Sequence, residues 1–355
     1  MFVTNNGSDS LTIIDKNTGF RTDVSVDIDQ EAHEAPHHLA IDPKTRSAFV
    51  ALSFPAAPSK TAKKDRHAAH GKGENTGKLV RLSLDTLTIE ESGEVDENPG
   101  DVVLSPDGRT VLVTHFDLGR AFRGAMAGGN PSTMMASLQL WDAKPLKLRE
   151  ARNLCVAPHG IAVTSDSALA IVACYGSDEL AIVDLRTLAT SRYPLGPSPG
   201  LLGAPKYGPY AAALSPDGLF VLVAEQEGQA LRIFDLGARR FVEGSRIMLG
   251  ARAMMPAYLD ATEALVPLQA PNGIVRVNLK DQAIAARRSF SGSATDDCKS
   301  PHVAALDTGG RAFLVCEGDH LSPGSVLELD RKTLATVHAW PVGVYPDGIA
   351  FGDGH

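Results

Sequence analysis

The sequence lacks several features that would fix a function at once. Nothing in its 355 residues approaches about 18 consecutive apolar residues, so we expect no membrane-spanning helix. Basic residues are too few for a nucleic-acid-binding surface, because 34 Lys and Arg face 42 Asp and Glu, giving a net charge of −8. No P-loop, dinucleotide-binding fingerprint or haem-attachment motif occurs. The patterns His-Glu-x-x-His (33–37) and Gly-x-Ser-x-Gly (196–200) do occur, but prolines within both argue against the helix and the nucleophile elbow that these motifs require. Serine and cysteine nucleophile mechanisms therefore have no support.

What the chain does have is a repeat. Residues 155–184 read as three short apolar strands separated by polar and Gly-containing turns, which is typical of antiparallel sheet. The start of this unit recurs in seven registers, each opened by a proline: Pro36, Pro99, Pro158, Pro209, Pro256, Pro301 and Pro346. A repeat of roughly 40–50 residues with four strands is the pattern of a propeller blade.

The repeats also predict how the ring closes. The last repeat offers one strand, around Gly348–Gly352, whereas the first begins in mid-unit and offers three strands within residues 1–27. We expect these segments to share a blade, which leaves no open sheet edge. The sequence thus predicts an all-β fold, a seven-bladed β-propeller of four-stranded antiparallel blades in a single domain, 1–355. Insertions at 54–77 and 116–136 are predicted to form loops on one face.

Several stretches resemble a known repeat. The segments FVTNNGSDSLTIID (2–15), SPDGRTVLVTHFD (105–117) and SPDGLFVLVAEQEGQALRIFD (215–235) are similar to the YVTN-type repeat of bacterial and archaeal propellers. That superfamily includes surface-layer-like proteins, haem d1 and nitrous oxide reductase propeller domains, and seven-bladed lactonases. The resemblance implies the propeller fold, which hosts both scaffolds and enzymes.

The four cysteines occupy one register in two blades. Cys155 and Cys298 each lie three residues before a Pro-His pair, and Cys174 and Cys316 each end the second strand of the same blade. This predicts the disulfides Cys155–Cys174 and Cys298–Cys316, and with them an oxidising compartment. The alternative is four buried thiols. No leader is visible, so we expect a periplasmic, cell-surface or secreted protein whose signal peptide has been removed.

The histidines are predicted to gather on one face. Because propeller strands alternate in direction, the start of strand one and the end of strand two lie on the same face. Nine of the eleven histidines map there: His33, His37, His38, His67, His70, His115, His159, His302 and His320. Imidazole suits copper, zinc, iron or nickel. We therefore expect metal ligands among His37, His38, His115, His159 and His302.

Two limits apply to that prediction. Adjacent strand residues point to opposite faces, so only one of His37 and His38 is expected to face the axis. His67 and His70 could chelate as a pair or stay solvated in their basic loop.

The resemblance adds a comparison for the metal. Nitrous oxide reductase and related copper-dependent propellers bind metal through inner-face histidines from several blades, including adjacent His-His pairs. The His37-His38 pair with His159 and His302 is similar in kind. The other blades offer Asp101, Tyr210, Ala257 and Asp347 instead. One or two ions, with copper first and zinc or iron next, are expected rather than a multinuclear cluster.

Other polar residues on this face suggest roles in catalysis. Glu225 and Glu317 are candidate general bases, and Tyr175 is a candidate proton donor or ligand-orienting group. A small polar or anionic substrate would be held by Arg120, Arg123, Lys206 and Tyr210.

Two functions therefore stay open. The first is an exported metal-dependent enzyme, an oxidoreductase above all, acting on a small polar or anionic molecule. The second is a non-catalytic scaffold or surface protein that binds a protein partner across the histidine-rich face. In the scaffold, the imidazoles would simply bond neighbouring blades and close the mouth of the channel.

Overall fold

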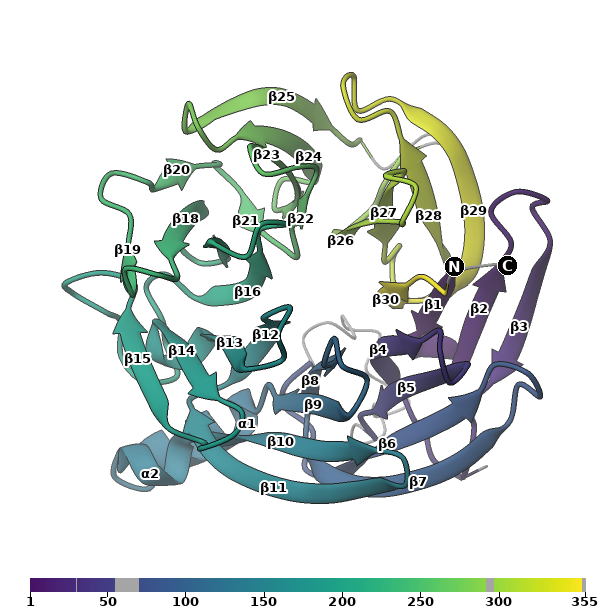
Figure 1. Cartoon of the computed structure of the whole chain (residues 1–355), viewed down its shortest axis with the longest axis horizontal. Coiled ribbons are helices and arrows are strands. Elements are labelled where there is room, and N and C mark those ends of the chain that lie inside the picture. Colours follow the sequence, from purple (N-terminus) through teal and green to yellow (C-terminus); the bar gives the residue numbers. More distant parts are fainter. Residues whose placement is uncertain (30, 55–69, 292–296, 353–355) are drawn as a thin grey trace.

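The computed structural model describes residues 1–29, 31–54, 70–291 and 297–352. Its strands form seven antiparallel sheets arranged as a ring around a central axis (Figure 1). The predicted seven-bladed β-propeller is confirmed. None of the helices in the described ranges is long and apolar enough to cross a membrane.

The first half of the ring holds three complete blades. The second blade contains β4 (Pro36–Asp42), β5 (Ser47–Leu52), β6 (Thr76–Ser83) and β7 (Ile89–Glu97). The third contains β8 (Pro99–Leu104), β9 (Thr110–His115), β10 (Ala136–Ala143) and β11 (Leu146–Cys155). The fourth contains β12 (Pro158–Val163), β13 (Leu169–Cys174), β14 (Glu179–Asp184) and β15 (Thr190–Pro194). In each, the first strand lies nearest the axis (Figure 1).

The second half is less regular. The fifth blade contains β16 (Pro209–Leu214), β17 (Phe220–Glu225), β18 (Ala230–Asp235), β19 (Arg240–Phe241) and β20 (Ile247–Met248). The sixth contains β21 (Arg252–Ala253), β22 (Ala257–Tyr258), β23 (Glu263–Gln269), β24 (Gly273–Asn278) and β25 (Ala283–Ser289). The seventh contains β26 (Pro301–Leu306), β27 (Ala312–Cys316), β28 (Pro323–Leu329) and β29 (Thr336–Val344).

The two ends of the chain close the ring as the repeats predict. The C-terminal strand β30 (Pro346–Ala350) is the innermost strand of the first blade and pairs with β1 (Phe2–Asn5). The blade is completed by β2 (Ser10–Ile14) and β3 (Arg21–Ser25). The pairing of Phe2 with Ala350 joins the ends of the chain within one sheet.

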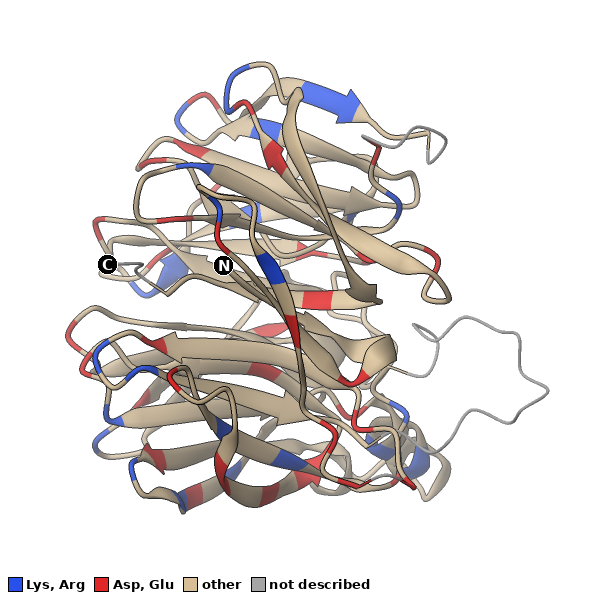
Figure 2. Ribbon diagram, turned by 90° about the vertical axis from the view of Figure 1, so that its right-hand side faces the viewer, with Lys and Arg blue, Asp and Glu red and all other residues tan. Residues whose placement is uncertain are grey.

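Apolar side chains fill the space between neighbouring sheets. Leu112 and Leu138 of the third blade pack with Val172 and Ala181 of the fourth, and all four are almost fully buried. Neighbouring blades therefore bury both faces of each sheet, which a single blade could not do alone. In the view of Figure 2, segments with Lys or Arg and segments with Asp or Glu are interleaved along the ribbon.

The insertion at 116–136 differs from the predicted loop because it contains two helices. The helix α1 (Leu118–Met126) is capped by Asp117, whose carboxylate accepts from the backbone N–H of Arg120 at 2.7 Å. The short helix α2 (Pro131–Met134) follows. Of the other insertion, residues 55–69 lie outside the described ranges.

Glycine at position 160 allows adjacent blades to approach closely near the axis. A Cβ atom there would lie 2.7 Å from Cα of Ala211 and 3.0 Å from the carbonyl oxygen of Tyr210. Both are backbone atoms of the next blade, so they cannot move aside as a flexible side chain would.

We therefore expect Gly160→Ala to destabilise the protein by about 1–3 kcal/mol through overpacking. Gly237→Ala is the matched control, because its new Cβ would meet only the Asp235 carboxylate at 3.5 Å. Chemical denaturation measures both changes. Equal stability of the two variants would contradict the proposed backbone contact.

Candidate metal centre

The first strand of each blade begins beside the axis, and in six blades a left-handed residue precedes its proline. These residues have φ between 48° and 55°: Ala35, Asn98, Ala157, Gly208, Ser300 and Tyr345. Only one is glycine, so the others are strained by about 1–2 kcal/mol each. The strand registers then shift just after the prolines of β4, β8, β12, β16 and β26. This turn and bulge position the side chains that follow the prolines.

The bulge explains why both histidines of β4 reach the same cluster. The register of β4 shifts between Pro36 and Leu39, which breaks the strict alternation of side chains. The rings of His37 and His38 lie 4.4 Å apart, and both contact the ring of His159, at 5.9 and 5.7 Å between centroids. The expectation that only one of the pair faces the axis is therefore wrong.

A fourth imidazole completes this cluster. The ring of His70 lies 4.5 Å from that of His37 and 5.8 Å from that of His159, and it stacks on Phe116 at 4.9 Å. Ring nitrogens of His37, His70 and His159 lie within 4.8 Å of one another, close enough to share one metal ion. We call His37, His38, His70 and His159 the imidazole cluster.

His70 is positioned by the short segment that follows it. The side-chain amide of Asn98 donates to the carbonyl of Gly73 at 2.9 Å, and its oxygen accepts from the Gly73 N–H at 2.7 Å. The N–H of Gly119 in α1 donates to the carbonyl of Gly71 at 2.8 Å. The helical insertion thus helps to hold a residue of the other insertion. His67 lies outside the described residues.

Three of these rings are oriented in the same way. Nδ1 of His38 lies 2.8 Å from the Asp101 carboxylate, Nδ1 of His159 lies 3.1 Å from the carbonyl oxygen of Tyr210, and Nδ1 of His37 bonds Asp347. With Nδ1–H donating, Nε2 carries the lone pair. Within the described ranges, Nε2 of these three histidines is buried and has no hydrogen-bond partner. A metal-binding histidine typically has this arrangement.

Burial also keeps two of the rings neutral. Loss of solvent lowers the pKa of His37, although the Asp347 carboxylate opposes the shift. The pKa of His159 falls well below 6.5, first through burial and then through the neighbouring imidazoles. Neutral imidazole is the form that binds a metal.

His302 lies beside the imidazole cluster in a different environment. Its Nδ1 is 2.9 Å from Oε1 of Glu317 and 2.9 Å from Oδ1 of Asp347. Burial alone would lower the pKa of His302, but these carboxylates outweigh burial and raise it to about 10. Asp347 is buried too, and His37 and His302 hold its pKa well below the usual value.

Tyr210 joins the two environments. Its ring stacks on His159 at 3.9 Å between centroids, and its hydroxyl lies 3.1 Å from Nε2 of His302. Burial raises the pKa of this phenol well above 10, so it stays protonated. It was predicted to bind a substrate, and the structure places it within the histidine-rich region.

The two candidate general bases, Glu225 and Glu317, differ by one residue in their position relative to the proline of the neighbouring strand. Glu225 pairs with Pro209 across its blade, whereas Glu317 comes one residue after Cys316, the partner of Pro301. Neighbouring strand positions point in opposite directions. Glu225 accordingly bonds Arg232 and Arg246 away from the cluster, while Glu317 contacts His302.

His115 shares the register of Glu225 and is also directed away. It pairs with Pro99, and its Nδ1 lies 3.0 Å from both the carbonyl and the hydroxyl oxygen of Ser137. The structure does not bring it to the imidazole cluster.

The remaining predicted site residues are occupied elsewhere. The Tyr175 hydroxyl donates to Glu227 at 2.9 Å, although its ring contacts Phe116 at 5.2 Å between centroids. Arg120 lies 3.3 Å from the Asp117 carboxylate, and Arg123 lies 4.0 Å from it. Lys206 is exposed and lies over the Tyr207 ring.

Sequence reasoning omitted three residues that the site uses. Asp347 and Asp101 were recognised at the strand starts, but as positions that lack histidine and not as partners for Nδ1. His70 was weighed both as a chelating partner of His67 and as a solvated loop residue, and it was not placed among the expected metal ligands. The two aspartates lie one and two residues after their prolines, the positions of His37 and His38 after Pro36, and that shared register could have identified them.

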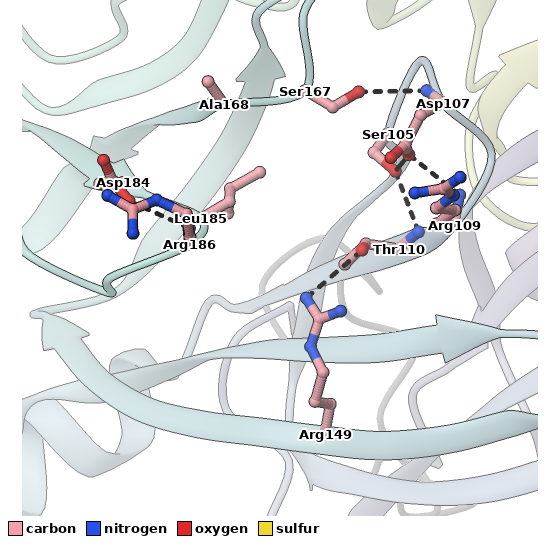
Figure 3. A pocket seen from close by; sticks show the side chains of 10 residues that line it. All are labelled: Ser105, Asp107, Arg109, Thr110, Arg149, Ser167, Ala168, Asp184, Leu185 and Arg186. Atoms are coloured by element: carbon pink, nitrogen blue, oxygen red, sulfur yellow. Dashed lines mark hydrogen bonds between the residues drawn. The ribbon is translucent and has the colours of Figure 1, made fainter.

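A separate groove lies on the opposite face, between the third and fourth blades. It is lined by residues that include Arg109 and Arg186 in turns and Arg149 in β11 (Figure 3). Arg149 donates to Thr110 at 3.3 Å, and no residue of the imidazole cluster lines this groove. The positive side chains there do not belong to the histidine site.

Comparison with known proteins adds information on the fold. No protein-family model and no curated protein sequence matches the chain. Among solved structures, the periplasmic gluconolactonase PpgL of Pseudomonas aeruginosa is similar with a TM-score of 0.67 and 16% identity, over 98% of this chain and 96% of that one.

Two further structures are similar over most of this chain. The hydrazine synthase of Kuenenia stuttgartiensis has a TM-score of 0.65 and 16% identity, over 88% of each chain. The dihydro-heme d1 dehydrogenase NirN has a TM-score of 0.61 and 15% identity, over 96% of this chain and 63% of that one. At these sequence identities, the similarity shows a shared fold and nothing about activity.

Both predicted disulfides are present, and each supports a strand that carries a histidine. Cys155 bonds Cys174, which pairs with Pro158, and Cys298 bonds Cys316, which pairs with Pro301. Each bond therefore fixes the link that leads into His159 or His302.

We expect the Cys155→Ala/Cys174→Ala variant to lose about 2–4 kcal/mol of stability, because the bond restricts the unfolded chain. Denaturation with and without a thiol reductant measures this. The wild type should lose more stability on reduction than the variant does. Equal responses to reductant would show that this bond does not form.

Proposed function

We propose that this propeller binds a divalent transition-metal ion at the imidazole cluster. The observation that carries the proposal is the shared orientation of His37, His38 and His159. Each Nδ1 contacts an acceptor, and each Nε2 is buried without a hydrogen-bond partner among the described residues. A buried polar atom left in this state costs about 1–3 kcal/mol, and a metal ion would remove that cost.

The donor set suggests which metals fit. Ring nitrogens of His37, His70 and His159 converge, and His38 contacts the same group. An all-imidazole site suits copper, zinc, iron or nickel, and the Irving–Williams order puts copper first. Such an ion could act as a Lewis acid or, if it is copper or iron, exchange an electron.

Export fits the same proposal. Two disulfides favour an oxidising compartment, and the similar propeller PpgL is described as periplasmic. We therefore propose a periplasmic, cell-surface or secreted protein.

Oxidoreductase activity on a small polar or anionic molecule is a second, finer proposal. It is favoured by Tyr210, a protonated phenol that stacks on His159 and could donate a hydrogen bond to a substrate beside the metal. Metal binding is supported more directly than this activity, because His37, His38 and His159 are at most 4% exposed. The candidate general base Glu225 is instead held by two arginines, which does not favour a catalytic role.

Metal analysis of the full, untagged chain tests the main proposal. After chelation and addition of copper or zinc, the wild type should retain stoichiometric metal through gel filtration. The His37→Ala/His159→Ala variant should lose the metal of the imidazole cluster while circular dichroism still shows a folded protein. The His338→Ala variant changes an exposed histidine of β29 and should behave as wild type.

Two results would contradict metal binding at this cluster. One is a wild type that retains neither metal, and the other is equal loss from the double variant and the His338 control. Either result would favour the non-catalytic scaffold that binds a protein partner. Electron exchange is tested separately, since copper bound at the cluster should show a Cu(II) resonance that a reductant removes and an oxidant restores.

A further inference from the structure

A second group of potential ligands lies beside the imidazole cluster. It consists of Nδ1 of His302 and one carboxylate oxygen each from Glu317 and Asp347, all within 4.8 Å of one another. The three side chains are at most 1% exposed. They come from the seventh blade and from β30, so blades at the closure of the ring bring them together.

The far atom of each side chain is held by a separate partner. Nε2 of His302 lies 3.1 Å from the Tyr210 hydroxyl, and Oε2 of Glu317 lies 2.7 Å from Nε2 of His320. Oδ2 of Asp347 bonds Nδ1 of His37. With these atoms fixed, Nδ1, Oε1 and Oδ1 are left facing one another. Supporting contacts of this kind orient the ligands of metal sites.

The near atoms are not well satisfied by one another. Nδ1 of His302 is 2.9 Å from both oxygens, but a single N–H shared between two carboxylates cannot be well aligned with both. Within the described residues, neither His302 Nδ1 nor Asp347 Oδ1 makes a hydrogen bond of good geometry. Two buried carboxylates also carry two negative charges, which a single imidazolium neutralises only in part.

We propose that His302, Glu317 and Asp347 form a second metal site, for a divalent cation that accepts mixed nitrogen and oxygen ligands. Zn²⁺, Mn²⁺ and Fe²⁺ belong to this class. Two positive charges would balance the two carboxylates. Asp347 would link this site to the imidazole cluster, because its other oxygen holds His37. The second site does not require the first to be occupied.

Zinc stoichiometry of the full, untagged chain tests this site. Apo-protein is incubated with excess Zn²⁺, passed through gel filtration and analysed by native mass spectrometry and elemental analysis. The wild type should hold two zinc ions. Glu317→Gln keeps the shape of the side chain but removes a charged ligand, so it should hold one, with zinc affinity at the second site reduced more than about 100-fold.

Glu225→Gln is the matched control. Glu225 is also a fully buried carboxylate at the end of a second strand, but it faces Arg232 and Arg246. This variant should hold two zinc ions. If both glutamate variants lose one ion, the loss follows from burial of an amide and the proposed site is overturned.

The outcomes also separate this site from the imidazole cluster. If the His37→Ala/His159→Ala variant keeps one ion and Glu317→Gln removes it, the second site stands on its own. If the wild type holds one ion that Glu317→Gln leaves in place and the double variant removes, the imidazole cluster stands and the second site is wrong. If the wild type holds none, both are wrong.

Discussion

The site depends on a backbone constraint that is repeated around the ring. A left-handed residue, a proline and a bulge begin the first strand of most blades, and together they bring the next one or two side chains to the axis. The bend is unfavourable for residues other than glycine, and cross-strand pairing holds it in place, with a disulfide beside it in the fourth and seventh blades. Ligands from separate blades can then meet without any local sequence motif.

The site beside the axis also buries several polar side chains. Imidazoles and carboxylates lie almost fully out of solvent, although burial of such groups is costly unless they are paired. Asp347 reduces the cost at two histidines, because one oxygen bonds His37 and the other contacts His302. Among the described residues, nothing bonds the buried Nε2 atoms of His37, His38 and His159, and a bound metal ion would supply that partner.

Much of the fold could be predicted because it follows from periodicity. Strand spacing, the proline registers and the split first blade led to seven blades and to the closure of β1 on β30. Shared register also led to both disulfides. The helices of the 116–136 insertion could not be predicted from the repeat, because an insertion has no counterpart in other blades.

The site was predicted less completely, and the reason is a matter of single residues. A bulge after Pro36 brings both His37 and His38 to the same cluster, although strict alternation predicts only one of them there. The order of polar and apolar residues does not indicate this bulge. One step in register separates Glu225, held by arginines, from Glu317, which faces His302. The roles of Asp101 and Asp347 depend on which ring atom each contacts, and that is a matter of geometry, not of spacing.

X-ray absorption spectroscopy of the full chain with one equivalent of copper tests the central claim most directly. A metal in the imidazole cluster would show a first shell of three or four nitrogen atoms at about 2.0–2.1 Å, the distance typical of metal–imidazole bonds. The outer-shell scattering pattern of imidazole rings should accompany it. A first shell of oxygen alone, without imidazole scattering, would contradict the account.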